Sequence, residues 1–265
     1  MSIGFIGCGN MASAIINGII ASNAVIAEEI YIYDIFYPAI EKMINQHNVN
    51  ICESEKDIVK KCDTVILAVK PNTISTVLNS INNSLEEKET LLISIAAGKT
   101  IDFIRSNLSH DNKIIRVMPN INAKVNEAIS AYCCSDNVTK EDKELCEAIL
   151  SSIGKVMCID EAHFPLFGVI GGCGPAMAYM FIDALARAGV KNGMKKDVAL
   201  MIAAQTVFGS AKMIMESNQH PWELIDQVCS PGGTTIEAVT SLQDYGLETA
   251  IHNAVDKAIE KDSKL

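Results

Sequence analysis

The sequence predicts an α/β fold in which a Rossmann-type doubly wound sheet precedes an all-helical domain. A glycine-rich turn from strand to helix stands at the start of the chain, and strand-like and helix-like segments then alternate over roughly the first 160 residues. From about Ala162 onward, every regular segment has helical spacing. We therefore expect two domains, residues 1–161 and 162–265, with a parallel sheet confined to the first.

The first element is a short apolar strand that ends at a glycine-rich loop. Ile3, Phe5 and Ile6 precede the loop, and an apolar pattern of helical spacing follows it. The first glycine permits a tight turn, the second allows close approach of a pyrophosphate, and a small third residue lets helix and strand pack. The helix N-terminus then faces the anion. An ordinary tight strand-to-helix turn is the alternative. We expect a dinucleotide to bind at Gly7, Cys8, Gly9, Asn10, Met11 and Ala12.

Seven further segments are predicted to be strands: residues 30–33, 49–52, 64–68, 90–95, 114–117, 128–134 and 155–159. Helices are predicted at 38–46, 54–61 and 139–152. Ligands of an open parallel sheet bind beyond the carboxyl ends of its strands. The cofactor cleft should therefore also be lined by Ala68, Val69, Lys70, Pro71, Ala96, Ala97, Gly98 and Asn120.

Asp34 ends the second predicted strand. A carboxylate at this position can accept hydrogen bonds from the hydroxyls of the adenosine ribose, and it would repel a 2′-phosphate. No arginine lies between Ile35 and His47 to receive that phosphate. The cofactor is therefore expected to be NADH or NADPH, with NADH favoured. A plain turn aspartate is the alternative interpretation of Asp34.

The second half of the chain contains five predicted helices, at residues 175–190, 197–217, 221–228, 235–244 and 247–261. The helix at 197–217 is apolar nearly all round, and one small helical domain cannot bury that much apolar surface internally. We expect a second subunit to cover it, which makes the protein a homodimer. A thick monomeric bundle is the alternative.

A second glycine-rich loop lies near the C-terminus, where Cys229-Ser-Pro-Gly-Gly-Thr-Thr235 opens a helical pattern. Exposed backbone N–H groups and hydroxyls in such a loop can hold a carboxylate. Simple capping of the helix is the alternative, but it would not require two glycines, two threonines and a serine together.

Composition excludes several classes of partner. The net charge of −10 disfavours nucleic acid and anionic membranes. Nine cysteines without a CxxC pair, and five scattered histidines, indicate reduced thiols in a cytoplasmic protein and no metal site.

No secretory signal is visible. The uncharged stretch 164–182 has nearly the length of a membrane span, but its glycines and Pro175 favour a broken start of a buried helix in a soluble protein.

The chain resembles the pyrroline-5-carboxylate reductase family over its full length, with the motifs in the family's order. The C-terminal loop is the most diagnostic of them. The resemblance rests on Ile6-Gly-Cys-Gly-Asn-Met11, Ala68-Val-Lys-Pro71, Ser94-Ile-Ala-Ala-Gly98, Arg116-Val-Met-Pro-Asn120, Gly174-Pro-Ala176, Gly209-Ser-Ala-Lys-Met213, His220-Pro221 and Ser230-Pro-Gly-Gly-Thr-Thr-Ile-Glu237.

The resemblance implies the final step of proline biosynthesis, in which NAD(P)H donates a hydride to the C=N carbon of 1-pyrroline-5-carboxylate. It implies that Ser230, Gly232, Gly233, Thr234 and Thr235 bind the small-molecule substrate. Thr235 would be the catalytic residue, as the hydrogen-bond partner of the ring nitrogen. The helical domain would interlock with that of a second subunit, and dimers can assemble into larger rings.

The sequence departs from the family pattern at Cys173, Met177, Ile121-Asn122 and Arg187, where serine, tyrosine, Thr-Pro and an acid are common. These changes keep open a reductase of a related cyclic imine carboxylate. A nucleotide-binding paralogue without activity is a further alternative, although it would not need the Ser230–Thr235 loop. Proteins that resemble the β-hydroxyacid dehydrogenases carry a catalytic lysine early in the first interdomain helix. That class is disfavoured here because no lysine lies between Lys155 and Lys191.

Overall fold

The computed structural model describes residues 2–262 and divides the chain into two compact units. The first unit extends to Gly172 and the second begins at Cys173. The predicted division between residues 161 and 162 stays a prediction. The helical segment Glu161–Lys191 contains both that position and the position between Gly172 and Cys173. Each unit is described separately below.

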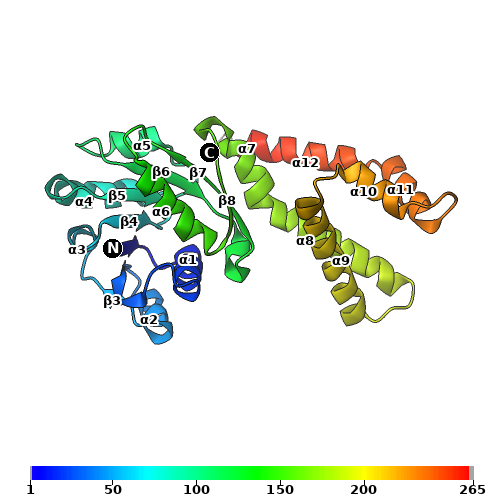
Figure 1. The fold of residues 1–265 in the computed structure, drawn as a ribbon, viewed down its shortest axis with the longest axis horizontal. Coiled ribbons are helices and arrows are strands. Elements are labelled where there is room, and N and C mark those ends of the chain that lie inside the picture. Colours follow the sequence, from blue (N-terminus) through cyan, green and yellow to red (C-terminus); the bar gives the residue numbers. More distant parts are fainter. Residues whose placement is uncertain (1, 263–265) are drawn as a thin grey trace. The chain divides into compact units, whose positions relative to one another are not determined.

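The first unit contains a single sheet of eight strands in the order β3-β2-β1-β4-β5-β6-β7-β8 (Figure 1). All neighbouring strands are parallel except β6 and β7. The strands are β1 (Ile3–Ile6), β2 (Ile30–Tyr33), β3 (Asn50–Ile51), β4 (Thr64–Leu67), β5 (Leu91–Ser94), β6 (Ile114–Met118), β7 (Ala128–Cys134) and β8 (Gly154–Cys158). This is the predicted Rossmann-type sheet with one reversed step.

The reversed step follows from the length of a connection. A parallel pair of strands needs a crossover of about a dozen residues or more, whereas antiparallel strands tolerate a short link. Residues 119–127 separate β6 from β7, and they hold only a 3-10 helix, Ile121–Val125. The uniformly parallel sheet expected from the sequence is therefore wrong at this one pair.

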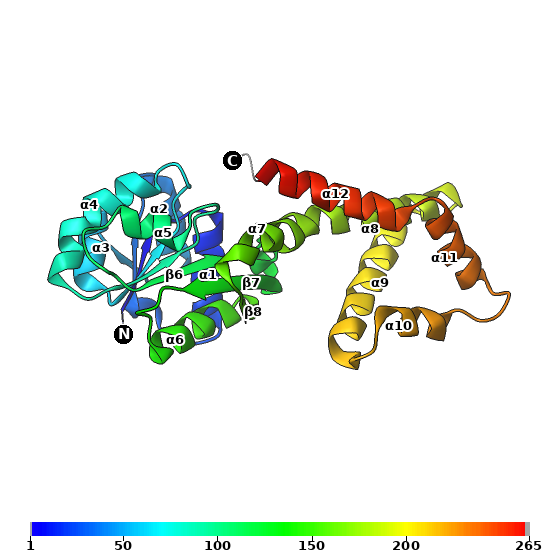
Figure 2. The same cartoon turned by 90° about the horizontal axis from the view of Figure 1, so that it is seen from above.

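Helices cover both faces of the sheet (Figure 2). Buried side chains of α1 and α6 pack on one face with Phe5, Ile66 and Ile93. Buried side chains of α3, α4 and α5 pack on the other face with Val65, Leu67 and Leu92. The helices are α1 (Asn10–Ala21), α2 (Tyr37–Gln46), α3 (Glu55–Lys61), α4 (Ile74–Glu87), α5 (Ile101–Ser106), α6 (Lys140–Ser151) and α7 (Phe164–Phe167), and 3-10 helices span Ala27–Glu29 and Glu161–His163.

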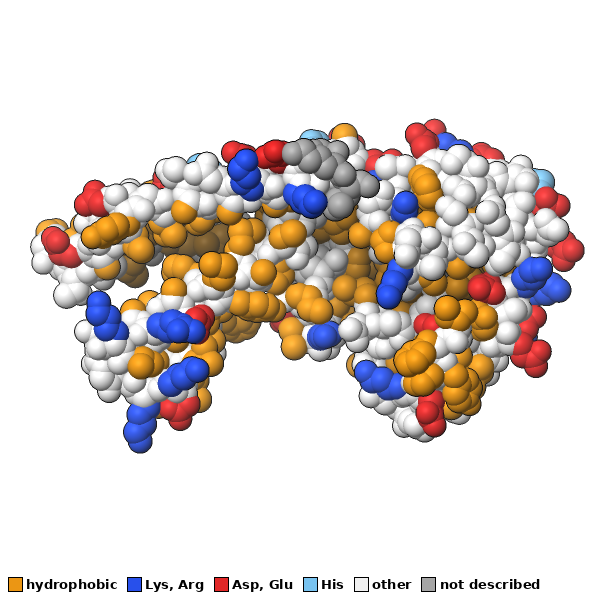
Figure 3. All heavy atoms as spheres, turned by 180° about the vertical axis from the view of Figure 1, so that it is seen from behind, with side chains coloured by type: hydrophobic (Ala, Val, Ile, Leu, Met, Phe, Trp, Pro, Cys, Tyr) orange, Lys and Arg blue, Asp and Glu red, His pale blue; other side chains and the backbone are white. Residues whose placement is uncertain are grey.

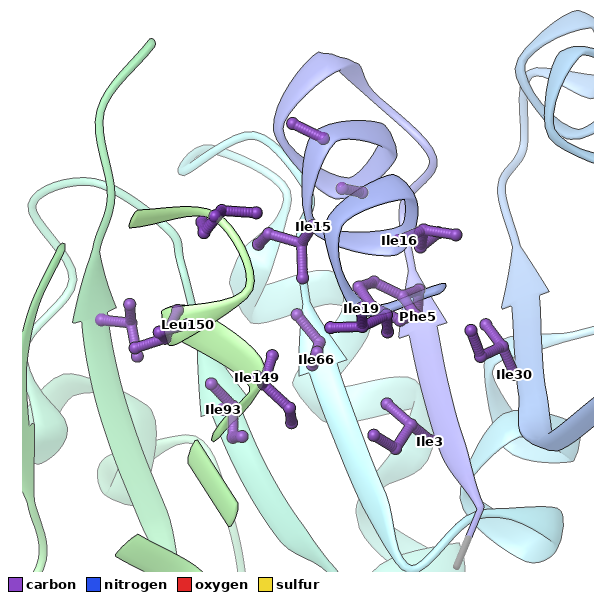
Figure 4. Close-up of a cluster of buried hydrophobic side chains, with 14 of the residues drawn as sticks. Ile3, Phe5, Ile15, Ile16, Ile19, Ile30, Ile66, Ile93, Ile149 and Leu150 are labelled. Atoms are coloured by element: carbon purple, nitrogen blue, oxygen red, sulfur yellow. The ribbon is translucent and has the colours of Figure 1, made fainter. Parts of the chain in front are cut away.

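The core of this unit is completely withdrawn from water. Figure 4 shows Ile15 of α1 above Ile66 of β4 and Ile19 beside Phe5 of β1, with Ile16 on the same helix. Each of these five side chains is at most 1% exposed. Strands buried on both faces appear in the sequence as continuous apolar runs, which explains why most of them were predictable.

A wide helical turn spans Gly168–Cys173, which we call the π-turn. It joins α7 to α8 within the helical segment Glu161–Lys191. The sequence predicted a break here because of its glycines and Pro175. That prediction is wrong, since the chain stays helical. The predicted burial is also only partial, because Ile170 is 59% exposed whereas Val169 and Gly171 are buried.

The second unit consists of helices: α8 (Gly174–Lys191), α9 (Lys196–Ser217), α10 (Pro221–Val228), α11 (Thr234–Asp244) and α12 (Leu247–Asp262) (Figure 2). Small residues allow α8 and α9 to approach closely, since a Cβ on Gly189 would lie 3.2 Å from Cβ of Ala199. Within residues 173–262, the buried positions are Pro175, Ala186, Ala199 and Ala203.

Large apolar side chains of the second unit are exposed along α8 and α9, including Met180, Met201, Phe208 and Met215. Figure 3 shows hydrophobic side chains gathered on this helical unit. By length and composition alone, the segments Glu161–Lys191 and Lys196–Ser217 could cross a membrane, and 11% of each apolar window is buried within the chain. Both segments therefore need a cover from outside the chain.

Candidate active site

The glycine-rich loop has the shape that an anion site requires. Gly7 has φ +102°, and a Cβ there would lie 2.7 Å from the backbone oxygen of Ala68, so this turn demands glycine. A Cβ on Gly9 would meet nothing within 4 Å, so the loop is open on that side. No side chain caps the N-terminus of α1. Its first N–H groups are thus available to a phosphate.

The two middle positions of the loop differ. Cys8 is 3% exposed, and burial, reinforced by the nearby Asp34 carboxylate, raises the pKa of its thiol to about 12. The thiol therefore stays protonated and contributes no charge to the site. Asn10 is exposed and begins α1, whereas Ala12 is fully buried against the sheet, which is the packing role expected of the third small residue.

Asp34 joins two loops at the carboxyl edge of the sheet. Its Oδ2 accepts a hydrogen bond from the Cys8 N–H at 2.7 Å, and its Oδ1 accepts one from the Phe36 N–H at 2.8 Å. The carboxylate thus holds the β1–α1 loop to the β2–α2 turn. Each oxygen keeps lone-pair capacity for a further donor.

A second carboxylate lies near the end of β2. Burial raises the pKa of the Tyr33 phenol, and the negative charges of Glu55 and Asp34 raise it further, in that order. Two acidic side chains are therefore close enough to Tyr33 to act on the same phenol. Glu55 is not among the residues predicted from the sequence, because its place at the start of α3 gives no local signal of this proximity.

The other predicted cofactor segments follow parallel strands and lie at the same edge of the sheet. The Ala68 N–H donates to the Ile6 carbonyl at 2.9 Å, and the Ile95 N–H donates to the Leu67 carbonyl at 3.1 Å. These bonds align the ends of β1, β4 and β5. Ala97, Gly98, Lys70 and Pro71 are exposed, and Ala68 and Val69 are half-buried, whereas Ala96 is buried. Gly98 has φ +71°.

Asn120 is buried, at 5% exposure, and its side chain is engaged within the first unit. The Nδ2 amide donates to the carbonyl of Gly171 in the π-turn at 2.9 Å. The Oδ1 oxygen accepts from the Asn122 N–H at 3.3 Å. The predicted role of Asn120 in binding the cofactor stays a prediction, and its amide already has protein partners.

The second glycine-rich loop belongs to the helical unit. The Gly233 N–H donates to the Ser230 carbonyl at 2.9 Å, and Gly232 has φ +67°. The positive φ of Gly232 favours glycine at that position, whereas a Cβ on Gly233 would only displace the Ser230 hydroxyl, which lies 2.4 Å away. Gly233 precedes α11 without any side-chain cap. Gly233 has no side chain that could cap the helix, so the interpretation of this loop as a ligand site stays a prediction.

The two threonines that follow begin α11. Thr234 is exposed and Thr235 is half-buried. Within residues 2–262, the Thr235 hydroxyl has no hydrogen-bond partner, so it is available to a ligand. The uncapped N–H groups of α11 can bind a carboxylate next to it.

The positions that depart from the family pattern have ordinary surroundings. Cys173 is exposed, Met177 is half-buried and Ile121 is 41% exposed. Arg187 forms an ion pair with Asp183 one turn earlier on α8, with Nε and Oδ2 separated by 2.5 Å. Among residues 2–262, no group of three or more His, Cys, Asp or Glu side chains could hold a metal ion.

Two family models match the chain. One, described as pyrroline-5-carboxylate reductase dimerisation, covers residues 161–265. The other, described as NADP oxidoreductase coenzyme F420-dependent, covers residues 2–98. The first begins just after β8, the second ends just after β5, and residues 99–160 lie between them.

Curated relatives match along the whole chain. Pyrroline-5-carboxylate reductase of Escherichia coli strain K12 is 43% identical over 264 residues, which are 99% of this chain and 97% of the relative. The enzyme of that name from Methanosarcina acetivorans is 39% identical over 263 residues, with coverage of 99% and 97%.

Solved structures agree with this. Plasmodium falciparum pyrroline carboxylate reductase with NADP bound superposes with a TM-score of 0.87 at 35% identity, over 99% of this chain and 97% of that one. A pyrroline-5-carboxylate reductase from Coxiella burnetii superposes with a TM-score of 0.94 at 30% identity and the same coverage. The predicted fold class, a Rossmann-type unit followed by a helical dimerisation unit, is confirmed.

Proposed function

The chain belongs to the pyrroline-5-carboxylate reductase family, and on that premise we propose which of its residues carry the reaction. The protein is an oxidoreductase that reduces 1-pyrroline-5-carboxylate to L-proline, the final step of proline biosynthesis. The observation that carries this conclusion is 43% identity to a pyrroline-5-carboxylate reductase over 264 residues, a span that includes both glycine-rich loops.

The cofactor is a pyridine nucleotide, which supplies the hydride. The fit of this chain to it rests on three features: the positive φ of Gly7, the open side of Gly9 and the uncapped N-terminus of α1. In the proposal these N–H groups bind the pyrophosphate, and the exposed residues after β4 and β5 line the rest of the cofactor. Asp34 holds the loop in shape through the Cys8 N–H and accepts from the ribose with its remaining lone pairs.

The substrate in this proposal binds to the loop Ser230–Thr235. The carboxylate accepts hydrogen bonds from the uncapped N–H groups at the start of α11, where Thr234 and Thr235 lie. The Thr235 hydroxyl bonds to the ring nitrogen. When hydride adds to the C=N carbon, the double bond becomes single and the nitrogen takes up one proton, which the hydroxyl can relay. Orientation supplies much of the rate, because no strong base is needed for this reduction.

An assay of the purified protein tests the activity directly. The protein is mixed with the pyrroline substrate and either NADH or NADPH, and the loss of cofactor absorbance is followed. Oxidation of either cofactor with this substrate is the expected result. Oxidation only with another cyclic imine would indicate the related reductase, and no oxidation with any imine would indicate a nucleotide-binding protein without activity.

We also propose a preference for NADH. The support is Asp34, directly after β2, because a carboxylate there disfavours a 2′-phosphate. Asp34→Ser keeps a hydrogen-bond acceptor for the Cys8 N–H but removes one charge. The ratio of kcat/KM for NADPH to that for NADH should rise about tenfold, which corresponds to about 1.4 kcal/mol. An unchanged ratio would refute this role of Asp34.

The protein forms a homo-oligomer, since the dimerisation family model covers the helical unit. We propose that the unit is a homodimer located in the cytoplasm, and that dimers assemble further. The two long apolar segments of the helical unit lie inside the region that this family model matches, so a second copy, rather than a bilayer, is the proposed cover.

A further inference from the structure

Three side chains on one face of β6 and its extension contact the helical segment of residues 161–172. They are Arg116 and Met118 of β6 and Asn120, which follows β6 after Pro119, and they alternate along extended backbone. Alternate residues of a strand lie about 6.6 Å apart on one face, close to the 5.4 Å pitch of a helix. A strand laid along a helix can therefore contact successive turns with every second residue.

The first contact is ionic and aromatic. Arg116 is 6% exposed, and its Nη1 lies 3.0 Å from Oε1 of Glu161, while the guanidinium stands 4.3 Å from the ring centroid of the buried Phe164. The same Glu161 oxygen accepts the Ile101 N–H at 2.8 Å, at the start of α5. A charge within an apolar strand needs such a partner, and this was the sequence signal available for Arg116.

The second and third contacts hold the π-turn. A Cβ on Gly168 would lie 3.2 Å from Sδ of Met118, so the backbone passes close to that sulfur. The Gly171 carbonyl accepts the Asn120 amide at 2.9 Å. A Cβ on Gly171 would lie 3.1 Å from the Phe167 ring, which leaves little room there. Wide turns of this kind are rare and occur mostly at functional sites. The buried Asn120 amide stabilises this one.

We propose that Asn120, together with Arg116, is a positioning residue of the reductase: it fixes the π-turn to the end of β6, directly before Gly174, where α8 begins. The inference rests on the proposed function, and it gives Asn120 a role other than contact with the cofactor. Hydride transfer tolerates little misplacement, since an error of about 1 Å can cost about 100-fold in rate.

Asn120→Asp tests the donated hydrogen bond at constant shape. The variant keeps an acceptor for the Asn122 N–H but places an oxygen against the Gly171 carbonyl. We expect kcat to fall about 10- to 100-fold, while the Kd for NADH, from titration of its fluorescence, stays within about twofold. Gly171→Ala, which crowds Phe167 without touching the amide, should give the same separation of kcat from Kd.

The matched control is Asn112→Asp, the same chemical change at another buried asparagine, which is 9% exposed. Its Oδ1 has no hydrogen-bond partner among residues 2–262, so this site shares the burial of Asn120 but not its contact. Thermal unfolding of both variants measures their losses of stability. The control variant should retain its kcat although its loss of stability is comparable to that of Asn120→Asp.

Two results would overturn the inference: a Kd for NADH that rises tenfold or more in Asn120→Asp with kcat retained, or both constants unchanged. Amide hydrogen exchange over residues 164–174 gives a readout that needs no activity. Exchange there should be faster in Asn120→Asp than in Asn112→Asp. If the wild-type protein does not reduce the substrate, the proposed function fails, and exchange alone then decides whether Asn120 holds the π-turn; unchanged exchange would refute it.

Discussion

Both units contain apolar helices, but the two units bury them to different extents. In the first unit, Ile15 and Ile16 of α1 are at most 1% exposed, because the sheet lies against them. In the second unit, Met201 and Phe208 of α9 are 73% and 54% exposed, and the buried positions are small residues and one proline. A helix that is apolar nearly all round must be covered by something. The first unit thus completes its core from its own chain, whereas the second depends on another copy.

The largest effect should come from a charge on the exposed apolar face. Met201→Glu would leave an unpaired carboxylate in the proposed subunit interface, which costs several kcal/mol. The dissociation constant of the oligomer should rise about 10³-fold or more, and activity should be lost with it. Light scattering after size exclusion measures the assembly. Met201→Leu, which conserves volume, should assemble normally. An oligomer that survives Met201→Glu would remove α9 from the interface.

A matched pair of truncations compares the two cores directly. Ile66→Ala, at a fully buried position, should lower the free energy of unfolding of the first unit by about 2–5 kcal/mol at any protein concentration. Ile214→Ala, at a position 49% exposed within the chain, should weaken the second unit in a manner that depends on concentration. Urea unfolding at two protein concentrations distinguishes them. Effects of Ile214→Ala that are independent of concentration would contradict the comparison.

In the proposed mechanism the first unit binds the cofactor and the second unit delivers the proton, so the comparison extends to function. Thr235→Ala should lower kcat about 100-fold, because a positioned proton donor contributes roughly that much. The Kd for NADH should not change. Thr235→Ser keeps the hydroxyl and should restore most of the rate. Hydride transfer at the wild-type rate in Thr235→Ala would show that this hydroxyl has no chemical role.

The smallest effect concerns buried thiols, which belong to the first unit. Burial is the main reason that the pKa of Cys62 rises from 9.0 to about 12. The protonated thiol is favoured in the folded state, so its stabilising effect is complete below pH 9 and is lost between pH 9 and 12.

Above pH 9, the unfolding free energy of the first unit should therefore fall by about 1.4 kcal/mol per pH unit for each such thiol. Cys62→Ala should reduce that slope by one thiol's share. Urea unfolding at about pH 9.5 and about pH 10.5 measures this slope, because both values lie between the ordinary pKa of the thiol and its raised pKa in the folded protein. The described cysteines of the second unit, Cys173 and Cys229, are exposed and half-buried, so its transition should respond less. An unchanged slope in Cys62→Ala would show that this thiol does not titrate differentially.

The local features of the fold could be predicted from the sequence. Gly7 and Gly9 mark a turn whose requirements lie within a few residues, and the apolar runs of β1, β4 and β6 mark strands buried on both faces. Helix α4 (Ile74–Glu87) was not predicted. Its many asparagines and serines have low helix propensity, and its helical character comes from the buried stripe that faces the sheet.

The parts of the site that depend on tertiary contacts could not be predicted. Nothing adjacent to Asp34 in the sequence indicates that its carboxylate accepts the Cys8 N–H, since the two residues meet only when β1 and β2 pair. Likewise, the contact between Asn120 and Gly171 joins residues 51 apart. The uncapped start of α11 was expected, because two glycines and two threonines in succession are a local pattern.

The uncovered faces of α8 and α9 have a consequence for synthesis in the cell. The first unit of a newly synthesised chain can fold without a partner subunit. The chain leaves the ribosome, however, with long apolar surfaces on its second unit that no partner subunit yet covers. During that interval it is a substrate for chaperones and prone to aggregate, so the yield of soluble enzyme should depend on how quickly two nascent chains meet.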